Sequence, residues 1–259
     1  METQTVMSGE YERPRPVAVV TGASTGIGLE WTKQLLAVGF RVFATTRDVE
    51  QATELHALSS EPGFQNTLEL DQRDSVSVNK AVAAVTAEVK EVNLLINNAA
   101  VVNEADVQDH VLNTTPEMLN QVFDVNCTGA LRCIHGFLPL LRAGRGTVAN
   151  MTSSLASVQR SMPNPGYFTA YRVSKAAMNM MTRSFASGEP EVIFVLLQPG
   201  VVDTHMGRNA RGTIPGMPDH LVKGLGVSKT VKNLLQVLQK LTSEDSGKIY
   251  LQDGEESPC

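Results

Sequence analysis

The sequence predicts an α/β protein with a doubly wound parallel sheet and helices on both faces. Short apolar runs typical of buried strands alternate along the chain with longer segments of helical pattern. Parallel strands need crossover connections, and helices in those crossovers cover the two faces of the sheet. The sharpest transition is the first, where the apolar run at residues 17–20 leads into a glycine-rich turn and then into a helical pattern.

The individual elements follow from the spacing of apolar residues and from the residues that end helices. Gly39 stands where a C-terminal cap would end the first helix, and Pro116 suits a first helical position, where the N–H that proline lacks has no partner. Glycines and prolines interrupt residues 205–226, which are expected to form a mobile loop. Strands are expected at residues 17–20, 41–45, 67–70, 93–97, 147–150, 191–197 and 248–251, and helices at residues 28–38, 75–91, 116–141, 171–185 and 228–241.

Composition indicates a globular protein with a large core. Hydrophobic residues make up 42% of the chain and charged residues 19%, which is outside the range of disordered proteins. No repeat, low-complexity tract or linker divides the 259 residues. We therefore expect one domain over residues 16–259, preceded by a disordered tail at residues 1–15.

The same composition argues against several classes of partner. A net charge of −5 provides no basic field for nucleic acid, and no run approaches the roughly 18 apolar residues of a membrane span. The N-terminus lacks the apolar core of a signal peptide. Three cysteines without a CxxC pair, and five histidines without HxH or HxxxH spacing, indicate neither a disulfide framework nor a metal site. We expect a cytoplasmic protein that binds no metal, membrane or nucleic acid.

Two motifs indicate chemistry. The first is TGASTGIG at residues 21–28, where glycines would let backbone N–H groups at a helix N-terminus approach a pyrophosphate; the alternative is a simple tight turn. The second is YRVSK at residues 171–175, which places Tyr171 and Lys175 four residues apart on one helical face. A YxxxK spacing can also arise by chance. The two together, in the right order along the chain, make coincidence a poor explanation.

In these motifs the chain resembles the short-chain dehydrogenase/reductase family, from about Pro16 to Gly254. The other matching elements are NNAA at 97–100, Asn126, NMTSS at 150–154 and QPGVVDT at 198–204. Within the family the chain looks most similar to the carbonyl-reductase-like, C-factor-like group. The resemblance implies a Rossmann-type fold and an NAD(P)-dependent oxidoreductase.

The family's catalytic tetrad would be Asn126, Ser153, Tyr171 and Lys175. Tyr171 would be the general acid in reduction, Lys175 would lower its pKa together with the oxidised nicotinamide, and Ser153 would polarise the substrate carbonyl, with Ser154 as the adjacent competitor. Asn126 would lie in a local helix distortion whose freed carbonyl holds a water in the proton relay. The alternative for Asn126 is a surface helical residue.

The resemblance also implies a nicotinamide cofactor and the residues that hold it. Arg47 follows the second strand, where an acidic residue would favour NAD; a guanidinium there suits a 2′-phosphate, so NADP(H) is expected. The alternative is that Arg47 pairs with Asp48 in solvent. Asp71 would accept a hydrogen bond from the adenine amino group, with Gln72 beside it. The expected cofactor-binding set is Gly22, Ser24, Thr25, Gly26, Ile27, Gly28, Arg47, Asp71, Gln72, Asn98, Ala99, Tyr171, Lys175, Pro199, Gly200, Val202 and Thr204.

Substrate recognition is expected between Ser153 and Tyr171 and in the loop at 205–226. Met162, Pro163, Tyr167 and Phe168 in the first of these segments suggest a bulky, fairly apolar carbonyl compound or alcohol as substrate, although such residues are also ordinary loop packing. The rival readings are an NAD-linked alcohol dehydrogenase and a non-catalytic dinucleotide-binding regulatory or signalling protein. A homodimer or homotetramer, paired through helices at 116–141 and 171–186, is expected from the family.

Overall fold

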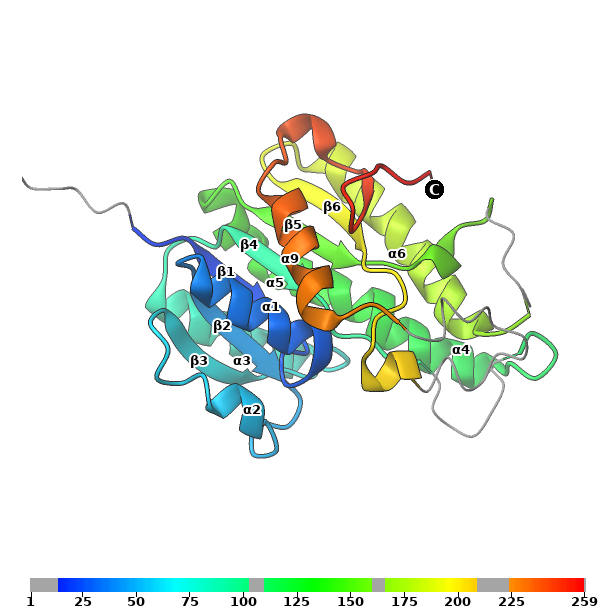
Figure 1. Ribbon diagram of the computed structural model, residues 1–259, viewed down its shortest axis with the longest axis horizontal. Helices are drawn as coiled ribbons and strands as arrows, with labels where there is room; N and C mark the ends of the chain where they lie inside the picture. The colour runs from blue at the N-terminus through cyan, green and yellow to red at the C-terminus, as the bar shows by residue number, and fades with distance from the viewer. Residues whose placement is uncertain (1–13, 103–109, 160–165, 209–223, 259) are drawn as a thin grey trace, which may run out of the picture.

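The chain folds around a seven-stranded parallel sheet with strand order β3-β2-β1-β4-β5-β6-β7 (Figure 1). The computed structural model describes residues 14–102, 110–159, 166–208 and 224–258. The predicted fold class is confirmed. The strands are β1 (Val17–Val20), β2 (Arg41–Thr46), β3 (Phe64–Glu69), β4 (Leu94–Asn97), β5 (Thr147–Met151), β6 (Ile193–Gln198) and β7 (Ile249–Leu251).

Helices cover both faces of the sheet. Helix α1 packs against α9 on one face, while α3 packs against α5 on the other and α4 contacts α6 (Figure 1). The structure also contains the short 3-10 turns η2 (Ser154–Ala156) and η3 (Ser243–Asp245). Residues 205–208, at the start of the expected loop, are helical instead. The helices are α1 (Gly26–Ala37), α2 (Thr53–His56), α3 (Ser75–Glu88), α4 (Pro116–Phe123), the π-helical segment η1 (Asp124–Gly129), α5 (Ala130–Ala143), α6 (Thr169–Gly188) and α9 (Val227–Leu238).

The central strands are apolar because both of their faces are buried. All four residues of β1 are buried, and successive side chains of a strand point to opposite faces. Ala18 and Val20 accordingly join the core beneath α1 and α9, whereas Val17 and Val19 join the core beneath α3 and α5. An uninterrupted apolar run is therefore what a central strand requires.

The strand order reverses direction at β1, and this places the site. The chain runs outward from β1 to β2 and β3, and then returns to β4 on the other side of β1. In open parallel sheets of this kind, a crevice forms beyond the carboxyl ends of the strands at such a reversal. The glycine-rich turn after β1 and the Asn-Asn segment at the end of β4 meet there.

Most differences from the predicted elements lie at their ends. Strand β3 begins at Phe64, three residues before the predicted start. Its first residues pair with β2 across a register shift between Val42 and Phe43. The polar residues Gln65 and Asn66 follow no apolar pattern, so the sequence does not indicate a strand there. The single helix expected at 116–141 is a run of α4, η1 and α5. Helix α2, one turn long, was not predicted because a turn of four residues has no periodicity to detect.

Parts of several expectations lie outside the described residues: most of the tail at 1–15, residues 209–223 of the loop at 205–226, and Met162 and Pro163. Among the described residues, no helix has the length and apolar character needed to cross a membrane. Within that same part of the chain, no group of three or more His, Cys, Asp or Glu side chains could hold a metal ion.

Candidate active site

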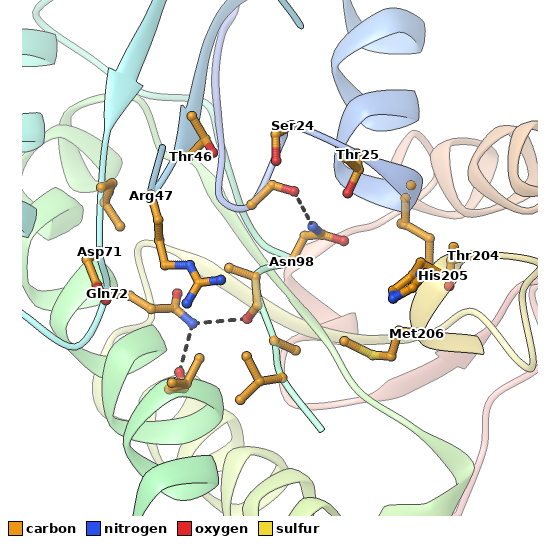
Figure 2. Close-up of a pocket in the computed structure, with 18 of the residues that line it drawn as sticks. Ser24, Thr25, Thr46, Arg47, Asp71, Gln72, Asn98, Thr204, His205 and Met206 are labelled. Carbon is orange, nitrogen blue, oxygen red and sulfur yellow. Dashed lines mark hydrogen bonds between the residues drawn. The ribbon is translucent and has the colours of Figure 1, made fainter. Parts of the chain in front are cut away.

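A cavity of about 630 Å³ opens at the carboxyl ends of β1, β2, β3 and β4. Figure 2 shows Arg47, Asp71 and Gln72 on one side of it and Thr204, His205 and Met206 on the other, with Ser24 and Thr25 of the glycine-rich turn between them. Of the residues expected to bind a cofactor, the cavity wall contains Gly22, Ser24, Thr25, Gly26, Ile27, Arg47, Asp71, Gln72, Asn98, Ala99 and Thr204.

The turn after β1 is shaped by close backbone contacts. Gly22 has φ +63°, and a Cβ there would lie 2.9 Å from Ala99. A Cβ on Gly28 would lie 2.2 Å from the carbonyl oxygen of Gly22. The Asn98 side chain donates to the carbonyls of Thr21 and Gly22 at 3.0 and 3.1 Å, so it fixes the turn from the end of β4. Gly28 thus packs the turn and does not line the cavity.

The first turn of α1 faces the cavity with its backbone N–H groups. Its N-cap Thr25 makes no side-chain capping hydrogen bond, and the turn contains no acidic residue. The positive end of the helix is therefore balanced by neither a cap nor a carboxylate. Gly26 has φ +56°, and a Cβ there would lie 3.3 Å from the Thr204 methyl group. A glycine at this position therefore leaves the space between the helix end and Thr204 free of a side chain. The arrangement suits a phosphate group.

Arg47 contributes a cationic group to the cavity. Its side chain is exposed, and Figure 2 shows it extending into the cavity on the side of Asp71 and Gln72. Within the described residues it forms no ion pair with Asp48, which was the alternative interpretation. The positive charge of Arg47 contributes to lowering the pKa of Asp71.

Asp71 already has a partner that the sequence interpretation did not single out. Arg73 forms a bidentate ion pair with it, with one N–O distance of 2.6 Å, and this hydrogen bonding is the main reason why the pKa of Asp71 is lowered. Arg73 also lines the cavity. Its position two residues after the aspartate, just beyond a strand end, is the only sequence signal for it.

Ser153, Tyr171 and Lys175 come together from the end of β5 and the first turns of α6. The side chains of Ser153 and Tyr171 are hydrogen-bonded, and the Nζ of Lys175 lies 5.7 Å from the centroid of the Tyr171 ring. That Nζ donates to the carbonyl oxygen of Met151 at 2.8 Å. Ser154 starts the turn η2 instead of joining the cluster. The structure therefore brings three of the four expected catalytic residues together, with Ser153 and Tyr171 in direct contact and Lys175 beside the tyrosine ring.

Burial governs the ionisation of both Tyr171 and Lys175. Burial raises its pKa to about 12, and the hydrogen bond with Ser153 opposes this only in part. Burial also lowers the pKa of Lys175 to about 8. The Lys175 nitrogen is directed to the Met151 carbonyl, and the lowering of the Tyr171 pKa by Lys175 together with an oxidised nicotinamide stays a prediction. Tyr171 is consequently a neutral phenol at neutral pH.

Asn126 is fully buried in the π-helical segment η1, not on the surface. Its side chain accepts from the Val101 N–H at 2.8 Å and donates to the Val101 carbonyl at 2.9 Å and to Ser174 at 3.0 Å. The expected distortion of the helix is confirmed. Since Val101 lines the cavity and Ser174 precedes Lys175, Asn126 joins the cavity wall to helix α6.

The rest of the expected cofactor-binding set, which includes Tyr171 and Lys175, is not among the residues that line the cavity. Pro199 and Gly200 turn the chain after β6, and Val202 is buried and bridged to Leu225; none of the three lines the cavity. Other lining residues lacked a sequence signal. Glu54 comes from the unpredicted α2, and Val125 comes from η1, beside Asn126.

Comparison with known proteins agrees with this geometry. A family model described as short chain dehydrogenase matches residues 16–214. An uncharacterized oxidoreductase of Schizosaccharomyces pombe is 30% identical over 246 residues, covering 92% of this chain and 96% of that protein. The C-signal protein of Myxococcus xanthus is 35% identical over 176 residues, covering 64% of this chain and 92% of that protein.

Among solved structures, the NADPH-bound carbonyl reductase from chicken fatty liver superimposes with a TM-score of 0.83 at 31% identity, covering 95% of this chain and 100% of that chain. The family match extends from the first strand into the segment after β6 and includes the glycine-rich turn, Tyr171 and Lys175. The chain therefore belongs to the short-chain dehydrogenase family and is an oxidoreductase.

Proposed function

We propose that this protein is an NADPH-dependent carbonyl reductase that converts a ketone or aldehyde to an alcohol. The observation that carries the proposal is the cluster of Ser153, Tyr171 and Lys175, joined through Asn126 to a cavity that has a phosphate-binding turn. A protein that only bound a dinucleotide would need the turn but not a proton donor beside it.

The residues of the cavity fit a nicotinamide dinucleotide. Gly22 and Gly26 line the cavity without side chains, Gly28 lets the turn pack closely, and the uncapped first turn of α1 suits a pyrophosphate. Asp71 and Gln72 lie on one side of the cavity, where the adenosine would bind, and Thr204 lies on the other, where the nicotinamide would bind. When bound, the cofactor supplies the hydride.

The protein's own residues supply the proton and stabilise charge. Ser153 donates a hydrogen bond to the substrate carbonyl oxygen, where negative charge develops. Tyr171 transfers its phenolic proton to that oxygen. The pKa of about 12 keeps the phenol protonated, as a general acid in reduction requires. Lys175 and the positive nicotinamide then stabilise the phenolate that remains.

Arg47 is the basis for NADPH over NADH. A guanidinium binds phosphate oxygens through two parallel N–H groups, and Thr46 stands where an acidic residue would repel a 2′-phosphate. Arg47 reaches the cavity without an ion-pair partner among the described residues. The similarity to an NADPH-bound carbonyl reductase supports the same choice.

The proposed substrate is bulky and fairly apolar, and the proposed setting is a cytoplasmic homodimer or homotetramer. Tyr167 and the buried Phe168 precede the helix that carries Tyr171, on the side where substrate is expected.

The free thiols of Cys127 and Cys133 suit a reducing compartment. On α6, Val173 and Met180 are exposed by 40% and 67%, which supports pairing through this helix.

One assay tests the proposal against its rivals. Purified protein is incubated with NADPH or NADH and a panel of aromatic and aliphatic ketones and aldehydes, while the absorbance of the reduced cofactor is followed. We expect consumption of NADPH with the bulkier apolar carbonyl compounds. Preferential use of NADH would favour the NAD-linked dehydrogenase. Tight NADPH binding without turnover of any compound would favour the non-catalytic regulatory protein.

A further inference from the structure

Gln72 is held in a single orientation between two parts of the site. Gln72 lies in the chain just after β3, and only 4% of its surface is exposed. The amide nitrogen Nε2 donates to the carbonyl of Ala99 at 3.0 Å and to the carbonyl of Val125 at 2.8 Å (Figure 2). A flipped amide would set its oxygen against two carbonyl oxygens, so both N–H groups are committed.

The oxygen of the same amide is left without a partner. Oε1 of Gln72 is buried and accepts no hydrogen bond from any described residue, although Gln72 lines the cavity. A buried acceptor without a donor is costly, and native proteins rarely retain one without a reason. A ligand that donates an N–H or O–H from the cavity would remove this cost.

Apart from the hydrogen bond to Ala99, the contacts of Gln72 lead to the π-helical segment η1. Val125, whose carbonyl accepts from Nε2, directly precedes Asn126. A π-helical turn disturbs the normal carbonyl pairing of a helix, and here the Gln72 amide satisfies one of these carbonyls.

Arg132 strengthens this connection. It donates to the Gln72 backbone carbonyl at 3.0 Å and pairs with Asp124, the first residue of η1, at 2.9 Å. The last residue of η1 is Gly129, where a Cβ would lie 2.7 Å from Cγ of Gln72. The segment and the side chain are therefore fitted to each other at both ends of η1.

We propose that Gln72 is a positioning residue that links the adenosine end of the cofactor to the π-helical segment that holds Asn126. Oε1 accepts a hydrogen bond from an N–H or O–H of the adenosine half, and Nε2 fixes Val125 at the same time. Filling the adenosine end then orders η1 and, through Asn126 and Ser174, the helix that carries Tyr171. The inference rests on the proposed function, because it requires that the cavity bind a nicotinamide dinucleotide.

Hydrogen exchange tests this role without relying on turnover. The probe is adenosine 2′,5′-bisphosphate, which contains the adenosine end but no nicotinamide. In the wild type, we expect saturating nucleotide to slow amide exchange at residues 124–129 at least severalfold. In Gln72→Met the nucleotide should bind roughly two- to twelvefold more weakly, as for one lost hydrogen bond, and should no longer slow exchange in this segment when saturating.

Two further variants separate positioning from packing. Gly129→Ala keeps Gln72 but displaces its side chain, so it should reproduce the loss of exchange protection. Gln34→Met is the matched control, because Gln34 also bridges two elements, donating to Glu30 in α1 and to Ser228 in α9, and none of these residues lines the cavity. Its exchange response should equal that of the wild type. Kinetically, Gln72→Met should lower kcat at saturating NADPH, whereas loss of adenosine binding alone would raise KM and leave kcat unchanged.

The outcomes distinguish the two proposals. If the wild type reduces carbonyl compounds with NADPH but nucleotide still protects residues 124–129 in Gln72→Met, Gln72 only fills space and the positioning role is wrong. If the wild type binds neither NADPH nor adenosine 2′,5′-bisphosphate, the proposed function fails and the role of Gln72 falls with it.

Discussion

The Nζ of Lys175 lies 5.7 Å from the centroid of the Tyr171 ring and is anchored by a 2.8 Å hydrogen bond to the carbonyl of Met151. The lysine is thus attached to the end of β5, next to Ser153, while the tyrosine is carried one helical turn earlier on α6. Holding a nearly fully buried ammonium group in this place lowers the pKa of Lys175 to about 8. Burial of this charge lowers the stability of the fold, and the charge lies where the proposed mechanism places a phenolate.

Tyr171→Phe should abolish reduction and preserve cofactor binding. The substitution removes only the hydroxyl group that donates the proton, and general acid catalysis of this kind contributes about 10²- to 10⁴-fold in rate. We expect kcat to fall by at least about a hundredfold, while the Kd for NADPH, measured by quenching of protein fluorescence, stays within about threefold. A residual rate near that of the wild type would show that another group donates the proton.

Lys175→Met should inactivate the protein but stabilise it at neutral pH. The pKa of Lys175 is lowered from 10.5 in the unfolded chain to about 8 in the fold, so below pH 8 the lysine is charged in both states and its full burial cost is present. Between pH 8 and 10.5 only the unfolded state keeps the proton, so stability of the wild type rises with pH. The difference corresponds to about 3 kcal/mol, less the lost hydrogen bond to Met151.

Urea unfolding at several pH values measures this effect. The midpoint for Lys175→Met should exceed that of the wild type at pH 7, and the gap should close as the pH approaches 10.5. A methionine variant that is less stable than the wild type at pH 7 would mean that the anchored ammonium stabilises the fold.

Arg47→Ala should weaken the use of NADPH much more than the use of NADH. The guanidinium would lose its contact with the 2′-phosphate, and hydrogen bonds to charged groups contribute about 1.5–3 kcal/mol, so KM for NADPH should rise about tenfold or more. Arg73→Ala is the matched control, because Arg73 lines the same cavity but is paired with Asp71. It should change both KM values alike. If Arg47→Ala raised KM for NADPH and KM for NADH equally, Arg47 would not be the residue that binds the 2′-phosphate.

The fold could be predicted from the sequence because its signals are local and strong. A strand such as Val17–Val20, buried on both faces, must be apolar throughout, and the glycine turn after it has few alternatives. Strand β3 was harder, since Gln65 and Asn66 lie on a partly exposed strand and follow no apolar pattern. The periodicity of apolar residues could not predict helix α2 or the π-helical segment η1, because each is too short to show a repeating pattern.

The site was predictable where a motif carries its chemistry in a fixed spacing, as in Tyr171 and Lys175. The ionisation of Tyr171 was not, because it depends on burial and on the direction in which Lys175 points, and neither can be read from a spacing of four. The partners of Gln72 were equally hidden. They lie 27 and 53 residues away along the chain, and only the fold brings them together.

Gly28→Ala should disrupt the turn after β1, whereas Gly188→Ala should be neutral. A Cβ at Gly28 would lie 2.2 Å from the backbone oxygen of Gly22, which cannot move aside as a flexible side chain could. Overpacking of this kind costs about 1–3 kcal/mol, and here it would also displace the N–H groups that face the phosphate. Gly188 ends α6 with nothing within 4 Å of an added Cβ. The thermal unfolding midpoint and the affinity for NADPH should both fall in Gly28→Ala, and both should be unchanged in Gly188→Ala.

Thr152→Val should loosen the attachment of α6 to β5, even though the two side chains have the same shape. The Thr152 hydroxyl donates to Oδ1 of Asn179 at 2.6 Å, and both residues are buried, so valine would leave the asparagine oxygen without a donor. Such an orphaned group costs about 1–3 kcal/mol. Asn179 lies one turn beyond Lys175 on α6, so the loss should also reduce kcat severalfold by shifting Tyr171 relative to Ser153. Thr152→Ser, which keeps the donor, should behave as the wild type.

The double variant Thr152→Val/Asn179→Leu removes both polar partners and should unfold at a higher temperature than Thr152→Val alone, because no buried acceptor is left unpaired. If instead the two single losses simply add, the pair does not act as one hydrogen-bonded unit, and the position of Tyr171 must be set by the Lys175 anchor.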